Sequence, residues 1–275
     1  HDTMNIEPFI EIAKKVVARQ QEQNWPTFLF YTVAEIHTGM EAYESAKKLL
    51  AELKQRVPGA KLLVLPNKME ELEVLVDSVA DVVGPNAISM TRQGAEMVHK
   101  AGKKLWFYGW GRERFRCGLI GWRLGNRGGV NEWYSSVQQS PFNPFDGKHQ
   151  DSWNDAPPLL GPDGPIPTPG LEKTTAGRID FLYLATLDRW MQRAESSNHP
   201  AAQKALDKAR AIVEELHNKI VPDYYYYYKR KKKALGERFV LDIPRDKIFG
   251  FAAEDYDRLR QRVATSVKEL KDVCN

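Results

Sequence analysis

Short apolar runs alternate with segments of helical periodicity through the first 122 residues, and this alternation constrains the fold more than any other feature of the sequence. The apolar runs cover 27–31, 61–65, 80–83, 104–108 and 117–122. Between the first four, apolar residues recur at helical spacing over 42–57, 69–76 and 91–101. Short apolar strands that alternate with helices form parallel βα units. They indicate either an open doubly wound sheet or part of a closed (β/α)8 barrel of the TIM type, and we expect the barrel.

The rest of the chain divides into an irregular segment and further helices. Helical periodicity is present at 6–17, 179–191, 205–216 and 259–270. The stretch from Arg123 to Gly170 is rich in Gly, Pro, Asn, Asp and aromatic residues, and it is too long for an ordinary connection, which predicts a functional or packed loop. We therefore expect a barrel portion over 1–195 and a C-terminal helical extension over 196–275. The two helices after the loop are expected to pack on the outside of the barrel.

Composition and charge exclude several classes of protein. With 42% hydrophobic and 28% charged residues, the chain falls in the globular range, which excludes wholesale disorder and collagen-like repeats. The excess of Lys and Arg over Asp and Glu, 40 against 36, is too small to indicate a polyanionic partner by itself. Cys117 and Cys274 are the only cysteines, which excludes a multi-Cys zinc cluster.

Three kinds of partner are therefore not expected. No apolar run approaches the roughly 18 to 20 residues that cross a bilayer, so we expect no membrane partner. His99 and His217 lack partners at ligand spacing, so we expect no metal, and nothing indicates another cofactor. The Gly-rich stretch 125–129 is interpreted as a turn and not as a phosphate cradle, because it lacks the Lys-Ser/Thr of a P-loop.

Polar and aromatic side chains follow the expected strands. In a parallel α/β domain the residues beyond the carboxyl ends of the strands converge on one mouth. The candidates there are Glu35, His37, Asn67, Tyr108, Trp110, Arg112, Trp122 and Arg123, with Trp133 further along the chain. Indole faces cover the apolar faces of sugar rings, whereas amide, guanidinium and carboxylate groups bind hydroxyls, so the set predicts a carbohydrate cleft. Trp106 and Trp122 are equally consistent with core positions, and His37 with a hydrogen bond to the backbone.

Several motifs occur together in a specific order and spacing. They are Trp25-Pro26 before the run 28–31, Lys104 to Tyr108, Gly121 to Gly125 leading to Trp133-Tyr134, Pro141 to Pro144, Gly164 to Thr168, and Gly177 to Asp180 with Tyr183-Leu184. In these residues the chain resembles, over roughly 20–195, the C-terminal half of barrel glycosidases related to glycoside hydrolase family 123, the β-N-acetylgalactosaminidases. The resemblance implies that the run at 27–31 is the fourth of eight strands. It also implies an extracellular or periplasmic location, and a missing half supplied by an upstream region or a second chain.

The resemblance further implies a catalytic role for Glu35. Such enzymes carry an Asp-Glu pair just after the fourth strand; the Glu protonates the leaving oxygen, and the Asp holds the 2-acetamido group that attacks the anomeric carbon. Glu35 occupies the position of the acid, but Ala34 stands where the Asp is expected and cannot orient an acetamido group. Three outcomes remain open: a second carboxylate acts with Glu35, the protein binds glycans without cleaving them, or it is an inactivated hexosaminidase. The candidate second carboxylates are Asp77, Asp81, Glu113, Glu132 and Asp146.

The sequence thus predicts a glycosidase with Glu35 as general acid and a glycan as substrate. The alternative is a non-catalytic carbohydrate-binding relative, and a solvated or ion-paired Glu35 is the structural alternative. A third interpretation is nucleic-acid association through 224–233, where five tyrosines precede five basic residues that could stack on bases and bind phosphates. A solvated basic edge beside a β-prone tyrosine run is the simpler explanation of that segment, because no RNA-binding fold signature accompanies it, so we do not expect a nucleic-acid partner.

Overall fold

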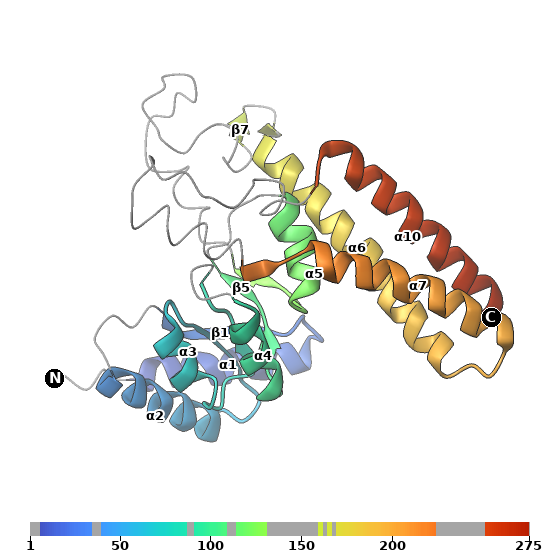
Figure 1. The fold of residues 1–275 in the computed structure, drawn as a ribbon. Helices are drawn as coiled ribbons and strands as arrows, with labels where there is room; N and C mark the ends of the chain where they lie inside the picture. Colours follow the sequence, from blue (N-terminus) through green and yellow to red (C-terminus); the bar gives the residue numbers. More distant parts are fainter. Residues whose placement is uncertain are drawn as a thin grey trace. The chain divides into compact units, whose positions relative to one another are not determined.

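The computed structural model of the chain describes most of its regular structure (Figure 1). The described residues are 6–34, 40–86, 91–108, 114–130, 159–161, 164–166, 169–223 and 251–274. Contacts divide the chain into two compact units. The first unit consists of His1–Gly109 and Asn126–Val130, and the second of Trp110–Gly125 and Asn131–Asn275. The division predicted at residue 195 falls inside the second unit, at the end of a helix.

The first unit contains a four-stranded parallel sheet with strand order β1-β2-β3-β4. Its strands are β1 (Leu29–Ala34), β2 (Lys61–Leu65), β3 (Val82–Val83) and β4 (Lys104–Leu105). After Trp106 the chain continues as β5 (Phe107–Tyr108), which pairs in parallel with β6 (Gly129–Val130). Each of the first four apolar runs thus contains a strand, as predicted, but the run 104–108 is divided at Trp106 into β4 and β5, which belong to different sheets.

Four helices accompany these strands, and those predicted from periodicity are confirmed. They are α1 (Glu7–Glu22), α2 (Met40–Arg56), α3 (Met69–Leu75) and α4 (Arg92–Lys100). The start of α4 is fixed by Thr91, whose side chain accepts a hydrogen bond from the backbone N–H of Gly94 at 3.1 Å. The chain leaves α4 through Gly102 with a φ of 69°, a conformation that favours glycine. Leu50, Leu62 and Leu105 are fully buried and form part of the core of this unit.

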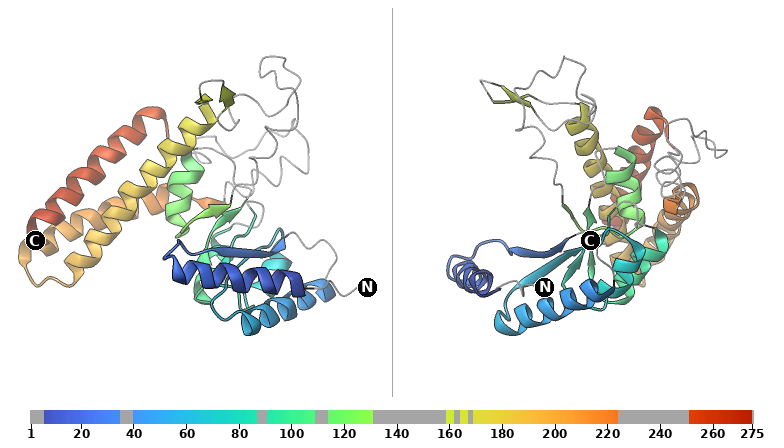
Figure 2. Two further views of the ribbon diagram at one scale, coloured as in Figure 1. Left: turned by 180° about the vertical axis from the view of Figure 1, so that it is seen from behind. Right: turned by 90° about the vertical axis from the view of Figure 1, so that its left-hand side faces the viewer.

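The second unit is helical. Its π-helix η1 (Arg116–Ile120) runs directly into α5 (Gly121–Arg123), and three long helices follow: α6 (Pro169–Glu195), α7 (Pro200–Lys219) and α10 (Ala253–Cys274). A short antiparallel pair, β7 (Leu159–Gly161) and β8 (Gly164–Ile166), precedes α6. Figures 1 and 2 show α6, α7 and α10 side by side as a bundle. The predicted helices at 179–191, 205–216 and 259–270 are confirmed.

Glycines allow η1 and α6 to approach backbone to backbone. A Cβ atom on Gly118 would lie 2.7 Å from the carbonyl oxygen of Gly177, and a Cβ on Gly177 would lie 2.6 Å from that of Arg114. One turn further along α6, the buried carboxylate of Asp180 accepts hydrogen bonds from Arg114 at 2.7 Å and from Arg260 of α10 at 2.6 Å. Asp180 therefore joins three helical segments at one point.

The prediction of a (β/α)8 barrel was wrong. A barrel requires strands that close into a ring, but within the described ranges β1 pairs only with β2, and β6 only with β5. Residues 117–122, predicted as the fifth strand, form η1 and α5. Their apolar character reflects a buried helical segment, which a short run does not distinguish from a strand. The strand β6, which pairs with β5 in a separate two-stranded sheet, begins at Gly129, the last residue of the Gly-rich stretch that was interpreted as a turn.

The predicted place of the later helices was also wrong. They were expected on the outside of a barrel, but α6 packs against η1, α7 and α10 within the helical unit. Among the described residues, no helix combines the length and the apolarity required to cross a membrane.

Candidate functional site

Besides the four-stranded sheet, the first unit has a two-stranded parallel sheet of β5 and β6, and an isolated parallel bridge between Asn86 and Tyr108 connects the two. We call the side on which these parallel strands end the carboxyl edge. The strands that end there are β1 at Ala34, β2 at Leu65, β3 at Val83, β5 at Tyr108 and β6 at Val130. Parallel pairing between neighbours keeps these ends together. Ligands of parallel α/β sheets bind beyond the carboxyl ends of the strands. The residues that follow each strand are therefore the candidates for a functional site.

Asn67 lies at the carboxyl edge, as predicted, two residues after the end of β2. The buried carboxylate of Glu71 stabilises the turn that contains Asn67. The backbone N–H of Asn67 donates a hydrogen bond to Oε2 of Glu71 at 2.5 Å, and the hydroxyl of Tyr43 donates to Oε1 at 3.4 Å. The Glu71 side chain is fully buried in the first turn of α3. Burial raises the pKa of Tyr43, and the neighbouring Glu71 carboxylate raises it further. Glu71 thus links α2, α3 and the turn that carries Asn67.

Asn86 and Tyr108 meet at the same edge through an isolated parallel bridge. The backbone N–H of Asn86 donates to the carbonyl of Pro66 at 2.8 Å, so the turns after β2 and β3 are joined directly. The Tyr108 side chain is buried and packs in a cluster with Leu63 and Leu65. Asn86 therefore belongs to the carboxyl edge together with the predicted Asn67 and Tyr108.

Sequence reasoning did not name Asn86 or Glu71 as site residues. Asn86 follows the apolar run 80–83 within three residues, as Asn67 follows 61–65, so the rule used for Asn67 would have found it. Glu71 stands four residues after Asn67, inside a predicted helix, and its burial could not be read from this position. Position after a strand was therefore a sufficient signal for Asn86 and not for Glu71.

Trp106, between β4 and β5, packs on the turn before β6. A Cβ atom on Gly128 would lie 2.5 Å from Cε2 of the Trp106 indole, so only glycine allows the ring to cover the backbone there. The indole also packs against the cluster of Leu63, Leu65 and Tyr108. These contacts favour the interpretation of Trp106 as a packing residue, and they explain a glycine at position 128.

Five of the predicted site residues lie outside the described part of the chain: Glu35, His37, Trp110, Arg112 and Trp133. In the sequence, Glu35 directly follows the last residue of β1, and Trp110 and Trp133 follow β5 and β6. Their roles stay predictions. The same holds for the Tyr/Lys segment 224–233 and for the candidate carboxylates at 113, 132 and 146.

Trp122 and Arg123 belong to α5 in the helical unit, and not to a strand end. The Trp122 side chain is 8% exposed, and its Nε1 donates to Oδ2 of Asp188 at 2.7 Å. Its ring centroid lies 5.3 Å from that of His217, whose pKa is lowered by burial and by the charge of Arg123. These contacts favour a packing role for Trp122. The strand predicted at 117–122 would have brought both residues to the mouth of the sheet, but residues 116–123 are helical.

Asp77 and Asp81 lie before β3, at the opposite edge from Asn67. Asp81 accepts hydrogen bonds from Lys54 at 2.7 Å, from Lys61 at 2.9 Å and from the backbone N–H of Leu62 at 2.9 Å. Burial alone would raise the pKa of Asp81, but these three donors together hold it below its usual value. Asp81 is therefore a structural carboxylate at the amino ends of the strands, and neither residue can act with a group at the carboxyl edge.

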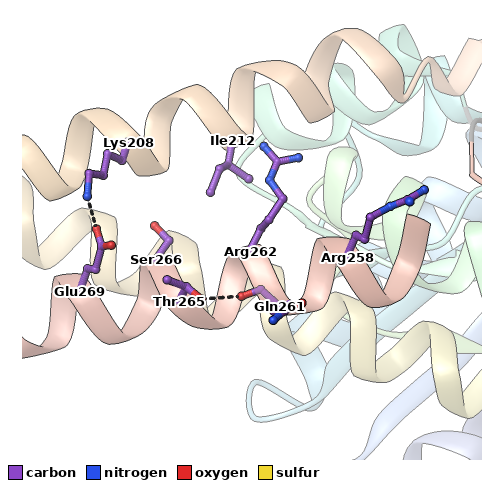
Figure 3. Close-up of a pocket in the computed structure, with 8 residues that line it drawn as sticks. All are labelled: Lys208, Ile212, Arg258, Gln261, Arg262, Thr265, Ser266 and Glu269. Atoms are coloured by element: carbon purple, nitrogen blue, oxygen red, sulfur yellow. Dashed lines mark hydrogen bonds and ion pairs between the residues drawn. The ribbon is translucent and has the colours of Figure 1, made fainter. Parts of the chain in front are cut away.

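The helical unit has a pocket of about 450 Å³ between α7 and α10 (Figure 3). It is lined by Lys208, Ile212, Arg258, Gln261, Arg262, Thr265, Ser266 and Glu269. Ion pairs neutralise its cations: Lys208 pairs with Glu269 at 2.8 Å, and Arg262 with Glu215 at 2.6 Å. The hydroxyl of Ser266 is buried and has no hydrogen-bond partner within the described ranges. The cations Lys208 and Arg262 are thus already paired with carboxylates in this pocket.

Neither a search for metal-ligand groups nor comparison with known proteins identifies the function of this site. Within the described part of the chain, His, Cys, Asp and Glu side chains form no group of three or more that could hold a metal ion. No protein-family model and no curated protein matches the chain. The relation to glycoside hydrolase family 123 therefore stays a resemblance in the residues quoted above.

Proposed function

We propose that the chain is a glycoside hydrolase whose substrate lies at the carboxyl edge of the parallel sheet, with Glu35 as the general acid. The observation that carries the proposal is the parallel order of the strands. Because β1 is parallel to β2, β1 ends at the edge that also carries Asn67. Glu35 is the next residue after β1 in the sequence, and Asn67, Asn86 and Tyr108 are the polar groups of the neighbouring strand ends.

The proposed reaction is hydrolysis of an O-glycosidic bond. The protonated carboxyl group of Glu35 gives its proton to the glycosidic oxygen as the bond from that oxygen to the anomeric carbon breaks. Water supplies the new hydroxyl group at that carbon and gives its remaining proton to a carboxylate base. Side-chain amides both donate and accept hydrogen bonds, so Asn67 and Asn86 suit sugar hydroxyls. Trp110 and Trp133 are proposed to cover the apolar faces of the sugar rings.

In this proposal, Ala34 determines which substituent the substrate carries at C2. It is the last residue of β1, and its methyl group cannot hold a 2-acetamido group. We therefore expect substrates with a hydroxyl at C2, and a second carboxylate from the protein. Glu132 suits this role best, because it comes two residues after the end of β6, whereas Asp77 and Asp81 come before β3.

The test compares Glu35→Gln with Glu44→Gln, a matched change at an exposed position of α2. Each protein is incubated with a panel of glycosides that carry either alkyl or 4-nitrophenyl leaving groups. We expect turnover of the alkyl glycosides to fall by about 10²- to 10⁴-fold in Glu35→Gln and to stay unchanged in Glu44→Gln. The loss should be smaller for 4-nitrophenyl glycosides, which need less help from an acid. Equal rates for Glu35→Gln and the unsubstituted protein would refute the role of Glu35.

Ala34 also favours a second candidate function, glycan binding without cleavage. In that case the protein binds members of a glycan array and releases no sugar from any of them. Glu35→Gln then leaves the dissociation constants unchanged within twofold. Hydrolysis of any bound glycan by the unsubstituted protein excludes this alternative.

A further inference from the structure

Helix α6 carries basic side chains that no carboxylate of the described residues neutralises. They are Lys173, Arg178, Arg189 and Arg193, and all four are exposed. Within the described part of the chain, none of them takes part in an ion pair. The Arg193 guanidinium lies 4.6 Å from the centroid of the Trp190 ring, a contact that leaves its charge in place. The helix therefore presents four positive charges that have no paired carboxylate.

The acidic side chains of α6 are used differently. Three of the four are held by neighbouring elements of the helical unit: Asp180 by Arg114 and Arg260, Asp188 by the indole N–H of Trp122, and Glu195 by Arg210. The fourth, Glu172, is exposed and lies in the first turn of the helix. From residue 173 to the end of α6, the exposed charges that are not paired are thus all positive.

The three arginines lie on one side of α6 together with an exposed leucine. At 3.6 residues per turn, Arg178, Leu182, Arg189 and Arg193 fall within about 60° of the helix circumference. The Leu182 side chain is 61% exposed. The buried Leu184 lies on the opposite side of the helix, so these four positions face away from the packed interior of the unit.

Further apolar side chains lie directly beside the arginines. Ile179 is 39% exposed and Tyr183 is 38% exposed, and both follow Leu182 around the helix on the same side. Contiguous exposed apolar side chains that are bordered by polar residues mark interaction sites. The α6 surface, as we call it, therefore combines positive charge with apolar contact area on one helix. Its members are Arg178, Ile179, Leu182, Tyr183, Arg189 and Arg193.

The α6 surface runs along a single helix, so it offers a ridge and not a groove between elements. The pocket of the helical unit is lined by residues of α7 and α10 and includes none of its members. Arg178 and Arg193 are separated by roughly 22 Å along the helix axis, so the ridge can rest on a flat partner. Its chemistry fits the interface of a bilayer, because arginine forms bidentate hydrogen bonds with phosphate and tyrosine is enriched at the level of the headgroups. Anionic lipids complement the unpaired arginines.

We propose that the helical unit binds the surface of a membrane that contains anionic phospholipids, through the α6 surface. The arginines bind the anionic oxygens of the headgroups, and Ile179, Leu182 and Tyr183 enter the boundary between headgroups and acyl chains. The sequence-based expectation of no membrane partner concerned segments that cross a bilayer, whereas contact of one helix face with its surface requires no such segment. This proposal does not depend on the proposed glycosidase function.

Sedimentation with vesicles tests the proposal on the full chain. One set of vesicles is an equal mixture of phosphatidylcholine and phosphatidylserine, and the other is phosphatidylcholine alone. We expect the protein to bind the first set at least about tenfold more tightly than the second. The difference should shrink as added salt screens the charges. Equal binding to both sets, or no binding to either, overturns the proposal.

Substitutions on α6 test which residues make the contact. Each basic residue near an anionic membrane contributes about fivefold in affinity, so the double variant Arg189→Gln, Arg193→Gln should bind about 25-fold more weakly. The double variant Lys48→Gln, Lys100→Gln removes two exposed charges from the first unit and should stay within about twofold of the unsubstituted protein, because distant charges are screened. Leu182→Gln should weaken binding about tenfold with an unchanged circular dichroism spectrum, since it removes apolar contact area at an exposed position.

Two further outcomes assign the binding to a different partner or a different segment. Tighter binding to soluble poly-L-glutamate than to the vesicles, with a loss in the same arginine variant, identifies an acidic polypeptide as the partner and overturns the assignment to lipid. Binding that persists in the arginine variant but is lost when the five basic residues 229–233 are replaced by glutamine places the contact outside α6 and also overturns the proposal.

Discussion

Asp81 joins more segments of the first unit than any other carboxylate described there. Its backbone N–H donates to Leu62 of β2, its carbonyl accepts from Lys104 of β4, and its side chain binds Lys54 of α2. The side chain is 23% exposed, so solvent weakens these contacts only in part. A hydrogen bond to a charged group contributes about 1.5–3 kcal/mol. Asp81 is therefore a main determinant of stability at the amino ends of the strands.

We expect Asp81→Asn to lower the free energy of unfolding by about 2 kcal/mol at pH 7, because charge-assisted hydrogen bonds are lost. The pKa of Asp81 is lowered in the folded state, so its stabilisation is present above its ordinary pKa of 3.8 and is lost as the pH falls below that value. The two proteins should therefore differ in urea denaturation at pH 7, and the difference should shrink as the pH falls below 3.8. A difference that persists undiminished at low pH would contradict the role of the charged form.

At the level of single residues, position after a strand was the informative signal. It placed Asn67 at the carboxyl edge, because the strand at 61–65 was predicted correctly, and Tyr108 at the end of β5, although the predicted run 104–108 is divided between β4 and β5. It failed for Trp122 because the partner that occupies its indole N–H, Asp188, lies 66 residues further along the chain. Local sequence contains no information about such a contact. A tryptophan in an aromatic, Gly-rich stretch can therefore be assigned to a site or to a core only once its neighbours are known.

At the level of elements, the close approach of η1 and α6 depends on two glycines that local propensity would not favour. Glycine inside a helix costs about 0.5–1 kcal/mol relative to alanine. Here the cost is offset, because a Cβ on Gly177 would meet the backbone oxygen of Arg114 at 2.6 Å, closer than such atoms can pack. The backbone of a neighbouring helix cannot move aside as the end of a long side chain can.

We expect Gly177→Ala to destabilise the helical unit by about 1–3 kcal/mol, because the added methyl group forces η1 and α6 apart. Thr175→Ala, at an exposed position of the same helix, is the control and should be neutral or slightly stabilising. Thermal unfolding followed by circular dichroism compares the two variants. An increase in melting temperature for Gly177→Ala would mean that helix propensity outweighs packing at this position.

Elements with long periodic patterns were predicted well, whereas the short segments at 117–122 and 129–130 were not. The helices α2, α7 and α10 are recognisable because their apolar residues repeat over several turns. The run 117–122 is too short for its period to separate a helix from a strand. β6 has two residues, one of them glycine, and it is a strand only because Phe107 and Tyr108 offer it a partner. Its existence depends on tertiary pairing and not on its own sequence.

At the level of the whole molecule, the alternation of strands and helices correctly predicted parallel pairing, whereas the closed barrel that we inferred from it was wrong. Closure is a property of the two edge strands, and no local pattern specifies it. The chain also leaves the first unit after Gly109 and returns to it at 126–130, so no single position in the sequence separates the two units. The predicted barrel portion was one continuous stretch of sequence, whereas each observed unit combines two separate stretches.

The buried ion pairs of Asp180 allow a test of whether the two units unfold independently. Asp180 is buried in the helical unit with its side chain 1% exposed, between Arg114 and Arg260. Asp180→Asn removes the charge that compensates both guanidinium groups, and breaking a buried pair of this kind costs about 3–5 kcal/mol. Because each unit has its own buried core, we expect hydrogen exchange to accelerate for amides of α6 and α10 but not for those of β2. Equal acceleration in β2 would mean that the two units unfold together.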